Sequence, residues 1–280
     1  MTEAAVGDIE RRAASLRRHV IRQAAGKGEG YVGQGMQSAD IFAALFFNEM
    51  NWSGQRLDDP ERDRFLLSVG HYAIALYAVL AEAGALSEEQ LSTYGADGSH
   101  LTLGAEPGDV PGVEFAGGSL GQGLGVAAGL AWGLRSTGSR ARVFNYMSDG
   151  ELQEGAVWEA AMFAAHAGLT NLVNIVDVNR TQADGPLVLE VEPVAEKFRA
   201  FGWHAHDVDG HDIPALLSAL RAAREQSEQP SCLVVHTTIG QGSETLRSRP
   251  SAHFVRIKPD DWAQVMTEVG LSDESVGSSS

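Results

Sequence analysis

Three short and almost wholly apolar segments, at residues 141–147, 172–178 and 231–236, alternate with segments of helical periodicity. Runs of this length without polar alternation are typical of strands that are buried on both faces. Strands that alternate with helices form parallel sheets covered by helices on both sides. The pattern therefore predicts an α/β fold, with a parallel sheet between two helical layers.

The same criteria place other elements along the chain. Helices are expected over residues 8–25, 38–48, 72–84, 121–134, 153–167, 192–201 and 212–226, a further short strand over 205–208, and a loop over 94–119, and residues 65–69 form a short apolar run. No repeat and no clear linker divides the sequence, so we expect one domain over residues 1–271. The polar residues 272–280 are expected to form a disordered tail.

Composition argues against several classes of protein. The 280 residues carry a formal net charge of −16, whereas a protein that binds a phosphate backbone needs clustered positive charge, so nucleic acid is not an expected partner. No apolar run approaches the ~20 residues of a membrane span, and several arginines near the start interrupt any signal peptide. The single cysteine, Cys232, has no internal bridging partner, which favours a reducing compartment, the cytoplasm.

Residues 28–33 match the glycine fingerprint of dinucleotide-binding loops letter for letter. That fingerprint requires a strand before the first glycine, and here a helix is expected before it. We therefore do not expect a nicotinamide cofactor at this loop.

A second group of residues has the composition of a metal cluster: His204, His206, Asp207, His211 and Asp212. Their spacing matches no recognised zinc-ligand pattern. Alternation along a strand edge explains His204 and His206 as solvent-facing side chains, so the metal cluster is the less favoured interpretation.

Asp149 and Asn179 each come just after a buried strand, with one helix between the two strands. A right-handed crossover places both residues at the carboxyl ends of parallel strands, where open α/β sheets bind ligands. A carboxylate, an amide oxygen and a nearby backbone carbonyl suit Mg²⁺ that also binds a diphosphate. Both residue types also close strands as ordinary turn residues, so spacing alone leaves two interpretations open.

The residues around these positions resemble a known family. Ser148-Asp149-Gly150-Glu151-Leu152-Gln153-Glu154-Gly155, continued to Asn179, resembles the thiamine diphosphate motif of transketolases. Four further stretches follow the order of that family: residues 70–77, 111–123, 209–212 and 236–242. The likeness extends from Gly26 to about Asp261 and is strongest to the N-terminal subunit of two-chain bacterial transketolases. It implies the diphosphate-binding fold of that family, with thiamine diphosphate and Mg²⁺ as cofactors.

The resemblance also implies a role for each matched residue. Mg²⁺ would be held by Asp149, by the side chain of Asn179 and by the backbone carbonyl of Thr181. Thiamine diphosphate would be contacted by His71, Gly118, Ser119, Leu120, Asp149, Gly150, Asn179, Ile239 and His253. The catalytic groups would be His71, His100, His253 and Glu154, the last in a carboxylate network between two cofactors at a subunit interface.

Three positions depart from the family pattern. Ser148 stands where the family usually has glycine, and a small residue still fits there. Tyr31 stands in place of a histidine that handles the hydroxyls of a ketose donor, because residues 30–33 replace the family's Gly-His-Pro-Gly. His100 is the one candidate for the next substrate histidine, and the loop over residues 101–110 is longer than the family pattern leads us to expect.

The leading hypothesis is a subunit that moves a two-carbon ketol unit from a ketose donor to an aldehyde acceptor, active only with a partner. Complete transketolases are more than twice this length, so the resemblance implies a second subunit with pyrimidine-binding and C-terminal domains, in an α2β2 assembly. The apolar helices over 121–134 and 153–167 favour contact with other chains, and the core of an ordinary sheet covered on both faces is the other explanation of them. The alternatives are the α-like half of a thiamine enzyme with a 2-oxo acid donor, and a noncatalytic cofactor-binding or regulatory relative.

Overall fold

The centre of the molecule is a five-stranded, fully parallel sheet. The computed structural model describes residues 3–108, 110–183, 185–249 and 253–271. The strands are β2 (Arg64–Leu67), β3 (Val143–Ser148), β4 (Leu172–Val178), β8 (Ser231–His236) and β7 (His204–Asp209), and this is their order across the sheet. The predicted α/β fold with a parallel sheet is confirmed.

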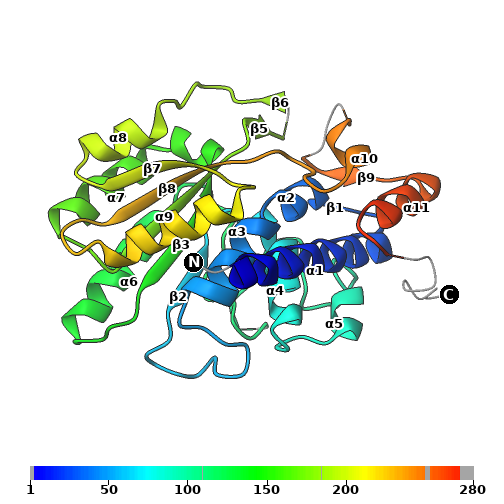
Figure 1. Cartoon of the computed structure of the whole chain (residues 1–280), viewed down its shortest axis with the longest axis horizontal. Coiled ribbons are helices and arrows are strands. Elements are labelled where there is room, and N and C mark those ends of the chain that lie inside the picture. The colour runs from blue at the N-terminus through cyan, green and yellow to red at the C-terminus, as the bar shows by residue number, and fades with distance from the viewer. Residues whose placement is uncertain (1–2, 109, 184, 250–252, 272–280) are drawn as a thin grey trace.

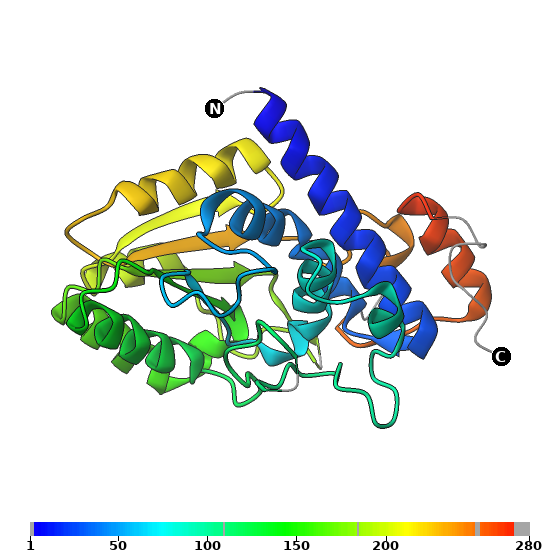
Figure 2. The same ribbon diagram turned by 90° about the horizontal axis from the view of Figure 1, so that it is seen from below.

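Helices cover both faces of this sheet (Figures 1 and 2). On one face lie α6 (Gly123–Ser136), α7 (Gly155–His166) and α8 (Val194–Ala200). On the other face lie α1 (Glu3–Lys27), α3 (Ala39–Ala44), α4 (Ala73–Glu82) and α9 (Ile213–Glu225). Figure 2 shows the green helices α6 and α7 below the strands, with the yellow α9 and the blue α1 and α3 above them.

The central strands are largely apolar because each side chain enters one of two cores. Along β3, Phe144 and Tyr146 belong to the core under α1, α3 and α9, whereas Val143 and Met147 belong to the core under α6 and α7. Successive side chains point to opposite faces of a strand, so a sheet with two covered faces also buries polar residues such as Asp177, and these need hydrogen-bond partners inside the protein.

The remaining elements are short. They are α2 (Val32–Gln37), a π-helical turn (Leu45–Glu49), a 3₁₀ turn (Gly70–Tyr72), α5 (Glu88–Ser92), a second 3₁₀ turn (Asp149–Gln153), α10 (Glu244–Arg247), α11 (Pro259–Glu268), and the antiparallel pairs of β1 (Glu29–Gly30) with β9 (Val255–Arg256) and of β5 (Thr181–Gln182) with β6 (Gly185–Pro186). The predicted helix over 38–48 is thus divided, and α5, α11 and the two strand pairs were not predicted.

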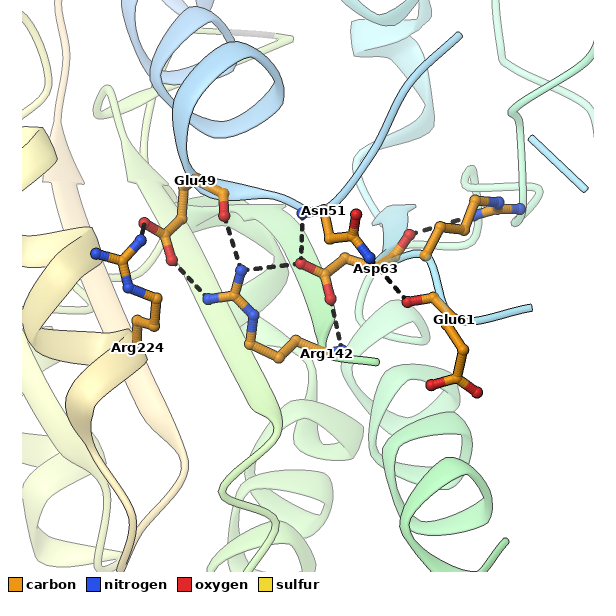
Figure 3. A network of polar contacts seen from close by, with 7 residues as sticks. Glu49, Asn51, Glu61, Asp63, Arg142 and Arg224 are labelled. Carbon is orange, nitrogen blue, oxygen red and sulfur yellow. Dashed lines mark hydrogen bonds and ion pairs between the residues drawn. The ribbon is translucent and has the colours of Figure 1, made fainter. Parts of the chain in front are cut away.

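A network of ion pairs holds together the ends of the strands that are remote from the carboxyl edge (Figure 3). Arg142, directly before β3, donates to Glu49 at 2.5 Å and to Asp63 at 2.9 Å. Glu49 also accepts from Arg224 of α9 at 3.1 Å, and Asp63 accepts the backbone N–H of Asn51 at 2.9 Å. These contacts fix the sheet at one end and leave the opposite end available for a site.

Within the described ranges, no helix has both the length and the apolar character needed to cross a membrane. The expected tail at residues 272–280 lies outside the described part of the chain.

Candidate active site

A cavity of about 410 Å³ opens at the carboxyl ends of β3 and β4. Five segments that are far apart in the sequence form its walls, because each of them reaches this edge of the sheet. Its lining residues are His71, Tyr72, Gly118, Leu120, Ser148, Asp149, Gly150, Asn179, Thr181, Gln182, Ala183, Pro186, Val188 and His253.

Asp149 lies at the bottom of this cavity, where β3 turns into a 3₁₀ helix. The turn is capped in both directions: the Ser148 side chain accepts from the third residue of the turn, and Glu151 accepts the Ser148 backbone N–H at 2.9 Å. The Asp149 side chain is buried and accepts the backbone N–H of Arg180 at 2.6 Å. Burial raises the pKa of Asp149 to about 7, because the charged carboxylate is cut off from water.

Asn179 and Thr181 face Asp149 from the turn that follows β4. Arg180, between them, has a φ of 57°, the left-handed conformation that reverses the chain within one residue. The Asn179 side-chain oxygen accepts the Thr181 backbone N–H at 2.8 Å, and β5 begins at Thr181. The tight turn therefore brings an amide oxygen and several backbone carbonyls to the same end of the cavity.

Two histidines stand opposite these oxygen groups. The rings of His71 and His253 lie 4.9 Å apart between centroids. Burial, and the nearby charge of His253, lower the pKa of His71 to about 3, so His71 is neutral at physiological pH. The Gln34 side-chain N–H donates to Nδ1 of His253 at 2.9 Å, which leaves the proton of that ring on Nε2.

Tyr31 packs against both histidines. Its ring centroid lies 4.8 Å from that of His71, 5.5 Å from that of His253 and 5.0 Å from that of Phe254. The phenol therefore stands beside the cavity, where the resemblance to transketolases leads us to expect a substrate histidine.

A close backbone contact brings the segment 118–120 to the cavity. A Cβ atom on Gly70 would lie 1.9 Å from the carbonyl oxygen of Gly117, and one on Gly117 would lie 2.2 Å from the carbonyl oxygen of Leu67. Glycine is required at both positions because no side chain fits between the two chains. The following residues, Gly118 and Leu120, consequently reach the wall of the cavity.

Comparison with known proteins identifies the family of this chain. The family described as "Transketolase, thiamine diphosphate binding domain" matches residues 9–277. The chain belongs to the transketolase family. Its predicted relationship and enzyme class are confirmed, and it carries the thiamine diphosphate-binding domain of that family.

Relatives of the same length strengthen this conclusion. An uncharacterised transketolase family protein of Sinorhizobium fredii is 47% identical over 92% of this chain and 94% of its own. One subunit of the apulose-4-phosphate transketolase of Actinobacillus succinogenes is 35% identical over 95% of this chain and 97% of its own. The 6-deoxy-6-sulfo-D-fructose transketolase subunit SqwG of a Clostridium species is 32% identical over 94% and 96%.

A solved structure gives the same fold in a longer protein. The transketolase of Leishmania mexicana superposes with a TM-score of 0.87 and 32% identity over 94% of this chain. This chain spans 41% of that transketolase.

Most of the predicted site residues of this transketolase family chain meet at the one cavity. They are His71, Gly118, Leu120, Asp149, Gly150, Asn179, Thr181 and His253. Four others do not line it. Ser119 is exposed beside it, and Ile239 lies half-buried in the loop after β8. Glu154 is exposed at the start of α7, against the backbone of Gly121, and His100 lines a different cavity, of about 340 Å³, next to α5.

Several residues of the cavity wall were missed by the sequence analysis: Tyr72, Gln182, Ala183, Pro186 and Val188. The sequence offered one signal for Tyr72: it carries a hydroxyl and directly follows His71, a residue that matches the family pattern. The other four come from the β5–β6 pair and the chain after it, and their place depends on how that hairpin folds over the sheet edge.

Among the described residues, no three His, Cys, Asp or Glu side chains converge as metal ligands. His204 and His206 lie on one face of the edge strand β7, each partly exposed, with buried Ala205 between them on the other face. Their Nε2 atoms are 2.8 Å apart. His211 points elsewhere and donates from Nδ1 to Asp40 at 2.9 Å.

The residues present fit a divalent cation. Asp149 is 1% exposed, and the neighbouring cation Arg180 pairs with Glu192 at 3.3 Å instead. A buried carboxylate without a cationic side chain is stabilised by a bound metal ion. The donors beside it are oxygen atoms of an amide and of the backbone, which are ligands that Mg²⁺ prefers.

Proposed function

We propose that the chain is the diphosphate-binding subunit of a two-chain transketolase, which moves a two-carbon ketol unit from a ketose donor to an aldehyde acceptor. The observation that carries this proposal is the cavity that combines Asp149, Asn179 and Thr181 with His71 and His253. The full-length relatives that are named as transketolase subunits support it.

The cavity residues divide the work of holding the cofactor. Asp149, Asn179 Oδ1 and the Thr181 carbonyl would hold Mg²⁺, which would neutralise the diphosphate. The backbone N–H of Gly150 and the ring of His253 would contact diphosphate oxygens from the cavity wall. When bound, thiamine diphosphate supplies the nucleophilic carbon that attacks the donor carbonyl. Neutral His71 lines the same cavity and would hydrogen-bond the cofactor without adding a charge.

A partner subunit completes the site in this proposal. Helices α6 and α7 pack against each other and expose large apolar side chains, Val126, Trp132, Met162 and Phe163, each between 45% and 53% exposed. Glycines at 125, 129 and 133 of α6 are exposed between them, which makes this surface flat enough for a helix of another chain. We place an α2β2 contact here, with Glu154 at its edge, and we assign the pyrimidine-binding and C-terminal domains to the partner.

The donor class has a second candidate, a 2-oxo acid. A phenol is bulkier than an imidazole and offers one oxygen in place of two ring nitrogens, so a tyrosine in this place cannot make the contacts with sugar hydroxyls that a histidine makes. The position of Tyr31 against His71 and His253 therefore favours a donor other than an ordinary ketose phosphate.

The test is a donor screen on the assembled enzyme. A ketose phosphate and pyruvate are offered in parallel, with an aldehyde acceptor, and product formation is followed with and without thiamine diphosphate and Mg²⁺. Two-carbon transfer that requires both cofactors supports the proposal. Binding of the cofactor without turnover of any donor would instead indicate the noncatalytic relative.

A further inference from the structure

Asp177 is a fully buried carboxylate, two residues before Asn179 on β4. Three side chains donate to it: Gln37 at 2.5 Å, Tyr146 at 3.0 Å, and Thr237 through a short hydrogen bond. The side-chain N–H of Gln37 also donates to the hydroxyl of Tyr72, so one amide joins the buried carboxylate to Tyr72.

The Tyr72 hydroxyl is an acceptor for two side-chain amides. It accepts from the Gln37 side-chain N–H at 3.0 Å and from the Asn179 side-chain N–H at 2.9 Å. Both acceptor positions of this oxygen are therefore in use.

This arrangement determines which way the Asn179 amide points. If the amide were turned over, its NH₂ group would meet the Thr181 backbone N–H that now donates to Oδ1, and the Tyr72 oxygen would lose the N–H that it accepts from Asn179. Each contact would leave a polar group unsatisfied, at a cost of about 1–3 kcal/mol for a buried group.

We propose that Tyr72, joined to Asp177 by Gln37, is a positioning residue that aims the side-chain oxygen of Asn179 at the metal ion of the cofactor. This inference rests on the proposed function, because it assumes that Asn179 is a ligand of that ion. It adds a residue that carries no metal-binding or catalytic role in the resemblance, and it gives Asp177 a task behind the site.

Tyr72→Phe tests this inference, and Tyr146→Phe is its matched control. Both substitutions remove one hydroxyl from the buried group around Asp177, but of the two hydroxyls only that of Tyr72 accepts from Asn179. The first measurement uses the ligand-free full chain: the side-chain NH₂ signals of Asn179 in a ¹⁵N–¹H spectrum. We expect them to shift and broaden in Tyr72→Phe and to stay in place in Tyr146→Phe.

The second measurement is the affinity for thiamine diphosphate in Mg²⁺, by calorimetry on the full chain with its partner. We expect about 10- to 100-fold weaker binding in Tyr72→Phe and wild-type binding in Tyr146→Phe, the range typical when a group that orients a ligand is removed. Thermal unfolding of both variants confirms that each remains folded.

The outcomes separate this inference from the proposed function. Unchanged Asn179 signals and unchanged affinity in Tyr72→Phe, with a wild type that binds, would overturn the positioning role alone. Equal losses in both variants would also overturn it, since they would trace the effect to Asp177 in general. A wild-type complex that binds no thiamine diphosphate would refute the proposed function, and this inference with it. The spectrum of the ligand-free chain still decides the orientation of Asn179 if Tyr72→Phe abolishes assembly.

Discussion

The ring centroid of Tyr31 lies 4.8 Å from that of His71, although α2, α3 and β2 separate the two residues in the sequence. Tyr31 lies directly before α2, and His71 lies in the 3₁₀ turn after β2. The contact places the Tyr31 ring directly behind a histidine that lines the cavity. The choice of donor is therefore the property of this transketolase family chain that we expect to differ most from ordinary transketolases.

Replacement of Tyr31 by histidine should raise the turnover of ketose phosphates. A histidine there is smaller and can accept or donate a proton near neutral pH, an effect worth about 10²-fold or more for positioned groups. The measurement is kcat/KM for a ketose phosphate in wild type and in Tyr31→His, with Tyr31→Phe as a control that removes the hydroxyl but keeps the ring. Ordinary transketolase turnover by the wild type would sink this prediction.

Removal of the Asp149 carboxylate should abolish cofactor binding without unfolding the chain. Asp149→Ala removes the one charged group that we assign to Mg²⁺, and we expect affinity for thiamine diphosphate in Mg²⁺ to fall more than about 100-fold. The affinity of Asp149→Asn, which keeps an oxygen without the charge, should lie between that of the wild type and that of Asp149→Ala. Calorimetry on the assembled complex measures this, and unchanged affinity in Asp149→Ala would mean that the metal site lies elsewhere.

Protonation of His71 should make the fold less stable in mild acid. The pKa of His71 is about 3 in the folded chain and about 6.5 in an unfolded one, so between these values the unfolded state binds more protons and stability falls as pH falls. From about pH 7.5 to about pH 5 the wild type should lose about 2 kcal/mol more unfolding free energy than His71→Gln. Urea unfolding at both pH values is the measurement; equal losses would show that His71 titrates normally.

The exposed surface of α6 and α7 should govern assembly. Trp132 is 53% exposed there, and a central aromatic residue of an interface contributes about 2 kcal/mol or more. Trp132→Ala should therefore weaken assembly about 30-fold or more in analytical ultracentrifugation of the complex. The control is Arg221→Ala, an exposed residue of α9 on the opposite layer, which should leave assembly unchanged. Normal assembly of Trp132→Ala would place the interface on another face.

The sheet was predictable because its strands are apolar on both faces and end at turn residues. The bounds of β4 and β8 equal the predicted ranges 172–178 and 231–236. The β1–β9 pair was not predictable by the same means, because it joins segments that are distant in the sequence. The side chains of Glu29 and Arg256, 227 residues apart, are 2.6 Å apart in it. Short elements of this kind depend on long-range contacts rather than on local periodicity.

The positions of Asp149 and Asn179 in the site were predictable in the same way. Both residues directly follow strands, so the topology of the sheet alone brings them to its carboxyl edge. Tyr72 could not be found in this way, since its role depends on Asp177 and Gln37, which the fold places around it. Ile239, expected near the cofactor, does not line the cavity in the ligand-free chain.

The most direct test of the account is thiamine diphosphate-dependent turnover by the purified chain alone and after it is mixed with a pyrimidine-binding partner, sought among the chains encoded beside it. The partner should supply the carboxylic acid that hydrogen-bonds the aminopyrimidine ring, and it should cover the apolar surface of α6 and α7. We predict no turnover by the single chain, and the joint appearance of cofactor binding and ketol transfer in the mixture. Measurable turnover by the single chain would contradict the two-chain enzyme.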